Sequence, residues 1–373
     1  MIFDTDKIVF KPQDVDLSFS PVFNDLKGKT YVLGAFNPGL TRLPDGNLLI
    51  MVRIAEALQQ PIYDNSIHTI RWTPEGYLEE GFALDEVVTD DPREFYLKDQ
   101  PSPVFALTSI SWLLPVELSP DGLDIIKIHY DKIITPDRSS QEYGIEDARI
   151  SFIDGKYYMT TCTVSSERHA TTLFISEDGL NYEFGGILLD HQNKDMLLFE
   201  GKAGNKYYAL TRPLGSQYLA TGNSSEWNPG PVIQLATSPD LFHWKPWDEP
   251  FIRARKGTIS NNKIGGGTPP VLTDKGWLML YHGVESSGEV GIYRTFWALL
   301  DKEDPSRIIK LEDRQFLLEA REELTTEMKD RIYLEDVVFS CGIADAGDFF
   351  IVASGELDLA CRITHIQKSC FGL

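Results

Sequence analysis

Two adjacent carboxylates and a guanidinium group mark the segment best suited to chemistry. Residues 143–149 read YGIEDAR and lead into an apolar run. If the backbone is extended here, Glu146 and Asp147 face opposite ways, whereas Asp147 and Arg149 share a face. An acid beside an arginine suits a sugar site, because the acid can transfer a proton while the guanidinium holds hydroxyl groups or an anion. The alternative interpretation is a structural ion pair at the edge of a sheet.

A second polar position lies in the segment AFNPGL, residues 35–40, which precedes an apolar run ending in Arg53. Asn37 stands before Pro38, and the residue before a proline favours extended geometry, so we expect the Asn37 amide to be displayed in a turn. An amide cannot act as a base. If Asp147 is the acid of a sugar-cleaving enzyme, either a second carboxylate comes from elsewhere or the nucleophile arrives already charged.

Further cationic side chains, Lys202, Arg212 and His282, stand near the ends of other apolar runs. The cluster GGGTPP at residues 265–270 precedes one of these runs, and such clusters make rigid turns where a ligand can approach the backbone closely. Taken singly, each side chain is explained as well by solvation or by a structural contact. Taken together, they converge if the strands share a central funnel.

The elements that must position these residues form a repeat, in which a glycine-led turn is followed by an apolar, aromatic-rich run. The copies are GNLLIMVR (46–53), GKYYMTTC (155–162), GNKYYALTR (204–212), GWLMLYH (276–282) and GDFFIVAS (347–354). Three further segments, SPDG at 119–122, SEDG at 176–179 and SPDL at 238–241, follow alternating runs and indicate hairpin turns. Repeated β units over the whole length are typical of a propeller. We predict an all-β fold, a five-bladed β-propeller; the alternative is a β-sandwich with coincidental hairpins.

Composition limits the kinds of partner. No linker or low-complexity stretch divides the 373 residues, so we predict one domain over residues 1–373, with helix expected only around residues 313–329. The formal charge of −21 argues against nucleic acid or an anionic membrane as a partner, because the protein's field repels both. A small neutral ligand is easier to bind. An anionic substrate needs its own local cluster of Arg, Lys and His.

The termini and the cysteines indicate a compartment. The first residues lack the basic start and apolar centre of a secretory signal, and no apolar run reaches membrane-spanning length. The four cysteines, which lack the Cys-x-x-Cys spacing, are Cys162, Cys341, Cys361 and Cys370. We therefore predict a soluble, cytoplasmic protein with reduced thiols and no metal site; the sequence is compatible with a homo-oligomer.

An ordered set of short segments resembles glycoside hydrolase family 130, the β-mannoside phosphorylases with their related β-mannosidases. The segments are FNPG (36–39), LTSIS (107–111), YGIEDAR (143–149), NKD (193–195), LF (198–199), RP (212–213), GGG (265–267), YHG (281–283), LLDKEDPS (299–306), CG (341–342) and GELD (355–358). The resemblance covers about residues 30–360. The LTSIS segment is similar to the branch that handles β-1,2-linked mannosides.

The resemblance implies a five-bladed propeller and an inverting displacement at the anomeric carbon of a β-mannoside. It identifies Asp147 as the proton donor, acting through a sugar hydroxyl, while inorganic phosphate attacks from the opposite face to give α-mannose 1-phosphate. Phosphate needs no protein base, which agrees with an amide at position 37, and it is a co-substrate, so no cofactor is expected. The expected phosphate ligands are Arg168, Lys202 and His282, the last binding best when protonated. The expected substrate-binding residues are Asn37, Arg53, Glu146, Arg149, Asp195, Arg212 and Asp358.

Departures from the family pattern leave other functions open. Where many phosphorylases of this family read FPEK, residues 199–202 of this chain read FEGK. Glu200, or Glu285, could serve as the base that activates water in an inverting β-mannosidase. Two non-catalytic alternatives are a carbohydrate-binding propeller that has lost its chemistry and a protein-interaction propeller. The last would expose an apolar patch at the mouth of the ring.

Overall fold

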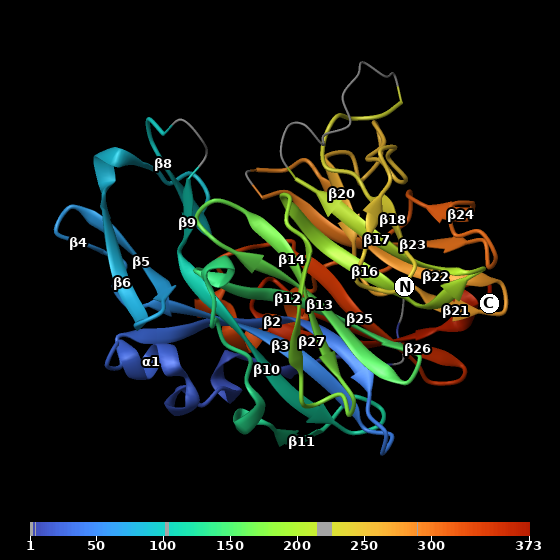
Figure 1. The fold of residues 1–373 in the computed structure, drawn as a ribbon, viewed down its shortest axis with the longest axis horizontal. Helices are drawn as coiled ribbons and strands as arrows, with labels where there is room; N and C mark the ends of the chain where they lie inside the picture. The colour runs from blue at the N-terminus through green and yellow to red at the C-terminus, as the bar shows by residue number, and fades with distance from the viewer. Residues whose placement is uncertain (1–2, 4, 101–103, 215–225, 289) are drawn as a thin grey trace.

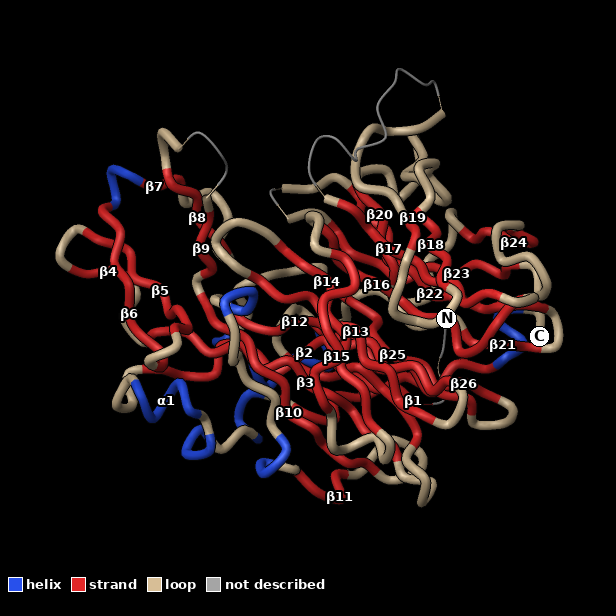
Figure 2. Tube along the Cα trace, in the orientation of Figure 1, coloured by secondary structure: helices blue, strands red, loops and turns tan. Residues whose placement is uncertain are grey.

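The computed structural model describes residues 3, 5–100, 104–214, 226–288 and 290–373. Strands dominate, and the helices are short pieces at the periphery (Figure 1, Figure 2). The helices are α1 (Pro21–Asp25), α2 (Glu322–Thr325) and the 3-10 segments Pro12–Asp14, Leu17–Phe19, Leu84–Glu86, Tyr130–Lys132, Ser139–Gln141, Thr326–Arg331 and Lys368–Phe371. None of the described helices has the length and apolar character needed to cross a membrane.

The described strands outside the arm defined below fall into five successive groups that are mainly antiparallel. The first is β2 (Thr30–Arg42), β3 (Leu48–Leu58), β10 (Ser109–Leu118) and β11 (Ile125–Ile128), and the second is β12 (Gly144–Ile153), β13 (Lys156–Val164), β14 (His169–Ser176) and β15 (Glu183–Leu189). The third is β16 (Asn193–Ala203), β17 (Lys206–Pro213), β18 (Gln234–Ser238) and β19 (Lys245–Pro246). The fourth is β20 (Lys263–Gly266), β21 (Val271–Thr273), β22 (Gly276–Glu285), β23 (Ile292–Leu300) and β24 (Ile308–Glu312). The fifth is β25 (Val338–Asp345), β26 (Phe349–Glu356), β27 (Ala360–Gln367) and β1 (Thr5–Phe10).

One parallel pair, Ser111 with Gly144, joins the first two groups into one sheet. Gly144 has φ +123°, and a Cβ there would lie 2.4 Å from the backbone nitrogen of Ser111. This junction therefore requires glycine.

The glycine-led repeats form corresponding strands, as the sequence predicted. They lie in β3, β13, β17, β22 and β26, each of which pairs with neighbours on both sides. Their apolar residues, such as Val52, Met159 and Leu280, are buried. The predicted hairpin turns are also confirmed, since they connect β10 to β11, β14 to β15 and β18 to β19.

An inserted arm separates β3 from β10. It consists of β4 (Ile62–Tyr63), β5 (Ser66–Thr73), β6 (Gly76–Ala83), β7 (Val87–Val88), β8 (Glu94–Leu97) and β9 (Phe105–Leu107), which form two three-stranded sheets. Figure 1 shows the arm in light blue and cyan at the left, rising beside the main body. A cluster that includes Phe95, Tyr143 and Val164 packs the arm against the second strand group.

The helix expected over residues 313–329 is largely wrong. Only α2 and the following 3-10 segment, residues 322–331, are helical. The chain before them is extended because Leu317 donates its backbone N–H to Thr295 of β23 at 2.7 Å and Leu318 is buried beside it. Tertiary pairing thus overrides a loosely helical pattern.

Three of the four thiols behave as small hydrophobic groups. All four cysteines are free, and Cys162, Cys341 and Cys361 are buried. Burial raises the pKa of all three of these thiols. The described residues contain no cluster of His, Cys, Asp and Glu that could hold a metal ion.

Candidate functional site

The first strands of three groups carry the same irregularity. The pairing register slips between Phe36 and Gly39 in β2, between Glu146 and Arg149 in β12, and between Lys194 and Leu197 in β16. The first unpaired residue of each slip has a left-handed backbone. These residues are Asn37 (φ +48°), Asp147 (φ +53°) and Asp195 (φ +54°). Asn and Asp tolerate this conformation better than most residues, and a bulge re-aims the side chains around it.

The bulges correct two expectations. Asn37 is left-handed rather than extended, despite the proline that follows. Glu146 and Asp147 were expected on opposite faces, but both side chains reach Arg53, because the left-handed residue breaks the alternation of the strand. The consequence is that two carboxylates from adjacent positions share one site.

A cavity of about 360 Å³ lies where these bulges meet. Its walls come from all five strand groups and from the arm. The lining residues are Leu33, Phe36, Asn37, Arg53, Ala55, Pro92, Arg93, Glu94, Tyr96, Leu107, Thr108, Ser109, Glu146, Asp147, His169, Lys194, Asp195, Arg212, Leu214, Pro231, Lys263, Tyr293, Tyr333, Val337, Phe339 and Asp358. This is the size range of small-molecule sites, and aromatic walls with several polar groups suit a sugar.

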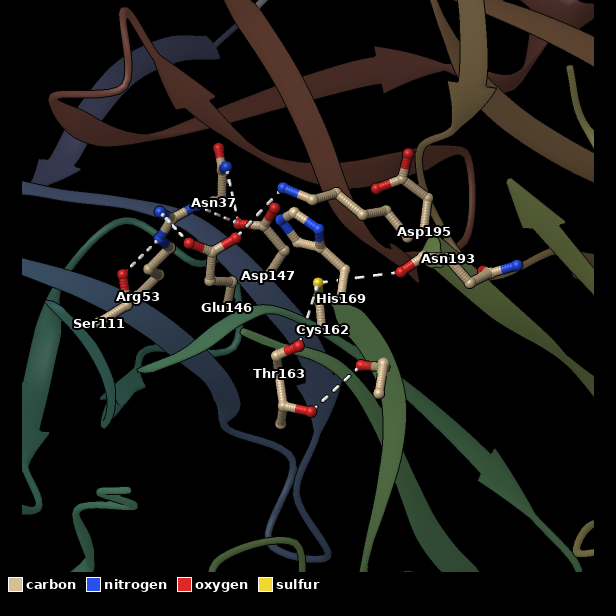
Figure 3. A network of polar contacts seen from close by, with 12 residues as sticks. Asn37, Arg53, Ser111, Glu146, Asp147, Cys162, Thr163, His169, Asn193 and Asp195 are labelled. Atoms are coloured by element: carbon tan, nitrogen blue, oxygen red, sulfur yellow. Dashed lines mark hydrogen bonds and ion pairs between the residues drawn. The ribbon is translucent and has the colours of Figure 1, made fainter. Parts of the chain in front are cut away.

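Arg53 of β3 pairs with both carboxylates of the Glu146–Asp147 bulge. Its Nη2 lies 2.7 Å from Glu146 Oε1, its Nη1 lies 3.1 Å from Asp147 Oδ1, and its Nε donates to Ser111 Oγ at 3.0 Å (Figure 3). The guanidinium also stands over the ring of Phe36. Arg53 therefore fixes both carboxylates in one arrangement.

Asp147 is ionised in the free protein. Burial raises its pKa, but Arg53, Arg149 and Lys194 lower it by more, and Asn37 Nδ2 donates to its Oδ1 at 2.9 Å; the pKa is lowered to about 2. The described side chains that bond to this carboxylate end on Oδ1. Its Oδ2 is left available for a ligand.

Cations are concentrated in this cavity relative to the rest of the chain. The chain has 35 Lys and Arg against 56 Asp and Glu. The cavity, in contrast, has equal numbers of both: Arg53, Arg93, Lys194, Arg212 and Lys263 against Glu94, Glu146, Asp147, Asp195 and Asp358. Because the cavity is less acidic than the chain as a whole, an anionic ligand is repelled less there.

Lys194 and Arg212 are two further cations beside the bulges. Lys194 Nζ lies 3.5 Å from Glu146 Oε2, and Arg212 Nε lies 2.9 Å from Asp195 Oδ2. His169 lines the cavity beside them, and its pKa is well below the usual range because it is buried and close to Lys194. The three side chains come from β14, β16 and β17.

Arg149 and His282 stand behind the cavity and do not line it. Arg149 Nε donates to Gly267 O at 2.7 Å and its Nη1 donates to Asp147 O at 2.9 Å, so the guanidinium braces the bulge that carries Asp147. His282 Nδ1 lies 3.2 Å from Gly266 O, and its Nε2 lies 3.3 Å from Arg212 Nη1. An imidazole that donates to the carbonyl and accepts from the guanidinium is neutral.

The expectation of a protonated His282 is therefore not met. Burial lowers its pKa well below the usual range, and Arg212, Lys263 and Arg149 lower it further. The histidine orients Arg212 from behind.

Four other predicted residues lie outside the cavity. Lys202 is exposed, with Nζ 4.6 Å from the centre of the Tyr207 ring. It follows Lys194 by eight residues in the same strand, a distance of roughly 26 Å along an extended chain. Arg168 is exposed and donates to the backbone carbonyl of Asp190 at 3.4 Å.

The two candidate bases are also elsewhere. Glu285 Oε2 pairs with Arg294 Nη1 at 2.6 Å. Glu200 Oε1 accepts from the backbone of Phe152 at 3.4 Å, and burial raises its pKa to about 7. Neither residue belongs to the cavity lining.

Seven predicted residues do line the cavity, and several of its other members were missed. Those brought together are Asn37, Arg53, Glu146, Asp147, Asp195, Arg212 and Asp358. Lys194 was missed although it immediately precedes Asp195, at the position that Glu146 holds before Asp147. That shared position was the available signal. The arm residues carry no comparable signal.

Comparisons with known proteins agree with this geometry. A sequence model of the family described as beta-1,4-mannooligosaccharide phosphorylase, glycoside hydrolase family 130, matches residues 110–369. Beta-1,2-mannobiose phosphorylase from Listeria innocua is 31% identical over 337 residues, which are 88% of this chain and 87% of that protein. 1,2-beta-oligomannan phosphorylase from Thermoanaerobacter sp. is 32% identical over 254 residues, 67% of this chain and 77% of that protein.

The fold agrees as well. The solved structure of the Listeria innocua enzyme in complex with beta-1,2-mannobiose superposes with a TM-score of 0.81 at 28% identity, over 98% of this chain and 97% of that chain. The similarity in sequence and fold thus spans nearly the whole chain, and the chain belongs to glycoside hydrolase family 130.

Proposed function

We propose that this protein cleaves β-1,2-linked mannosides by phosphorolysis, with inversion at the anomeric carbon. The observation that carries the proposal is the placement of Asp147 in one cavity with Lys194 and Arg212. An acid on one side of a sugar and clustered cations on the other are what transfer of a glycosyl group to phosphate requires. The β-1,2 linkage is taken from the names of the similar phosphorylases.

In the proposed reaction the terminal mannose lies between Asp147 and the cations. The proton of Asp147 passes to the leaving oxygen as the bond from that oxygen to C1 breaks. A phosphate oxygen held by Lys194 and Arg212 attacks C1 from the opposite face, which gives α-mannose 1-phosphate and a shortened sugar. Arg53 and Asn37 hold the carboxylate in place.

The low pKa of Asp147 fits a site that is incomplete without phosphate. The cations that lower this pKa include Lys194, a proposed phosphate ligand. A bound phosphate dianion offsets these charges, so it raises the pKa of Asp147 and favours the protonated form that can act as an acid.

We further propose that the five strand groups are blades of one propeller domain. All five contribute side chains to a single cavity, as inner strands around a common axis would. Strand β1 completes the last group by pairing with β27, which joins the beginning of the chain to its end. A crystal structure that showed the groups in a stacked sandwich would contradict this arrangement.

The test of the reaction is the dependence of turnover on phosphate. We expect β-1,2-mannobiose to give equal amounts of α-mannose 1-phosphate and mannose with phosphate, and to remain intact without it. Release of two mannose molecules in phosphate-free buffer would instead establish an inverting hydrolase. Such an enzyme would need a base other than Glu200 or Glu285, since neither lines the cavity.

A further inference from the structure

The bulges form the most buried part of the cavity, and the arm contributes more exposed residues to its lining. The side chain of Asp195 is 1% exposed, that of Asp147 is 12% exposed and that of Lys194 is 24% exposed. On the arm, the side chain of Arg93 is 35% exposed and Tyr96 is 40% exposed. Exposure thus rises from the bulges towards the arm.

This rise in side-chain exposure predicts the direction in which an oligosaccharide lies in the cavity. The phosphate and the terminal mannose need the buried bulges, because the acid and the cations are there. We expect the rest of the sugar chain to extend towards the more exposed side of the cavity. The part of the substrate that departs after cleavage therefore meets the arm.

The arm offers the groups that bind a sugar at this place. The Tyr96 ring is exposed in the cavity, and its hydroxyl donates to Glu94 Oε1 at 2.8 Å, which fixes the ring orientation. Arg93 is held by Asp91 through two hydrogen bonds, from Nε at 2.9 Å and from Nη2 at 2.7 Å. A preorganised ring can stack on the apolar face of a pyranose, and preorganised charges can meet its hydroxyls.

The arm also lies outside the general family pattern. The family match covers residues 110–369, whereas the described arm residues lie before it, between 62 and 107. Asp147 and Arg212 fall inside the match, whereas Asn37 and Arg53 lie before it, as the arm does.

We propose that Tyr96 of the arm is a specificity residue that binds the leaving sugar, so that the arm sets which mannosides are accepted. This inference rests on the proposed phosphorolysis. It assigns the leaving sugar to the arm, and phosphate to Lys194 and Arg212. The two roles make different kinetic predictions.

The test is Tyr96→Ala, measured in both directions of the reaction. We expect the KM for β-1,2-mannobiose in phosphorolysis, and for the acceptor mannose in synthesis, to rise about tenfold, the effect of losing one aromatic contact. The KM values for phosphate and for α-mannose 1-phosphate should change less than about twofold, which is within ordinary scatter. Tyr96→Phe keeps the ring but loses the hydroxyl bond to Glu94, so its KM should lie between those of the parent and Tyr96→Ala.

Tyr63 provides a matched control, because it is also 40% exposed and belongs to the arm but does not line the cavity. Tyr63→Ala should leave all four constants unchanged. An unchanged acceptor KM in Tyr96→Ala, or a changed phosphate KM, would overturn the inference.

A second readout separates this inference from the proposed reaction. If the parent enzyme shows no phosphate-dependent turnover, the proposed function fails, and calorimetry of β-1,2-mannobiose binding still tests the arm. Weaker binding by Tyr96→Ala than by Tyr63→Ala would support the inference. Equal binding by the two variants would contradict it.

Discussion

Asn37 Nδ2 donates a hydrogen bond of 2.9 Å to Asp147 Oδ1, although the two residues are 110 positions apart in the sequence. Both stand on matching bulges, with φ values of +48° and +53°. A bulge of the same type in each of two strand groups therefore brings the amide and the acid into contact. This pairing fixes one carboxylate oxygen and leaves the other for a ligand.

Replacement of Asp147 tests the acid. Asp147→Asn keeps the shape of the side chain and tolerates the left-handed backbone, but it removes the proton donor. We expect turnover to fall by about 10²–10⁴-fold. Binding of β-1,2-mannobiose, measured by calorimetry, should persist. The exposed Asp131→Asn should behave as the parent, and substantial turnover by Asp147→Asn would exclude this residue as the acid.

Substitution of Asn37 tests the coupling between the two bulges. Asn37→Asp places a second carboxylate at hydrogen-bond distance from Asp147, and a like charge raises the pKa of the pair. We expect the alkaline limb of kcat/KM against pH to move to higher pH. Asn37→Ala removes the amide donor and strains a left-handed position, so it should lower the rate. If Asn37→Asp had the pH profile of the parent, the two side chains would not be coupled.

Two lysines of β16 allow a matched test of the phosphate site. Lys194 lines the cavity, whereas Lys202 of the same strand is exposed outside it. Lys194→Ala should raise the KM for phosphate about tenfold to a hundredfold, since a hydrogen bond to a charged group contributes about 1.5–3 kcal/mol. Lys202→Ala should leave it unchanged. The reverse result would return the phosphate site to the position first expected from the sequence.

The two lysines also show what the sequence can and cannot predict. The repeats predicted the central strands correctly, because a glycine-led turn and a buried apolar run recur in each group. Asp147 was found because adjacent carboxylates and an arginine lead into an apolar run, and Arg212 because it ends one, whereas Asp195 was expected from the family resemblance. A bulge, however, shifts the register by tertiary fit, so its effect on Glu146 and Lys194 does not appear in a pattern of alternation.

The arm shows a second limit. Its strands are short, and its residues reach the cavity only because the arm packs beside the second strand group. Arg93 and Tyr96 therefore resemble ordinary surface residues when the sequence is read alone. The single domain, the cytoplasmic location and the oligomeric state stay predictions from sequence.

Buried histidines should make stability depend on pH. Burial lowers the pKa of His282 and of His169, so below about pH 6.5 the unfolded chain binds protons that the folded protein does not. Folding stability is therefore full above this pH and falls as the pH decreases, by about 1.4 kcal/mol per pH unit for each histidine. Urea unfolding at pH 5 to 8 measures this slope. His282→Asn should lower this slope by about one proton, and a slope equal to that of the parent would contradict the assignment.

The ion pairs of Asp6 should tie the beginning of the chain to the last strand group. Asp6 of β1 accepts from Arg362 Nε at 2.6 Å and from Arg362 Nη2 at 2.8 Å, and also from Arg321 Nη1 at 2.7 Å. Burial raises the pKa of Asp6, but the two arginines lower it by more, so its stabilisation is present above the unfolded pKa of about 3.9 and is lost as the pH falls below it.

Asp6→Ala removes one carboxylate from the buried Arg362, which keeps Glu356 Oε2 at 2.9 Å, so it should cost about 1.5–3 kcal/mol of unfolding free energy at pH 7, the contribution of a hydrogen bond to a charged group. Lys7→Met, at the next position of β1, is the control and should have little effect. If β1 closes the last group, Asp6→Ala should also increase hydrogen exchange in β27, which pairs with it. A loss of stability without faster exchange in β27 would mean that Asp6 acts locally and that the strand pairing does not depend on it.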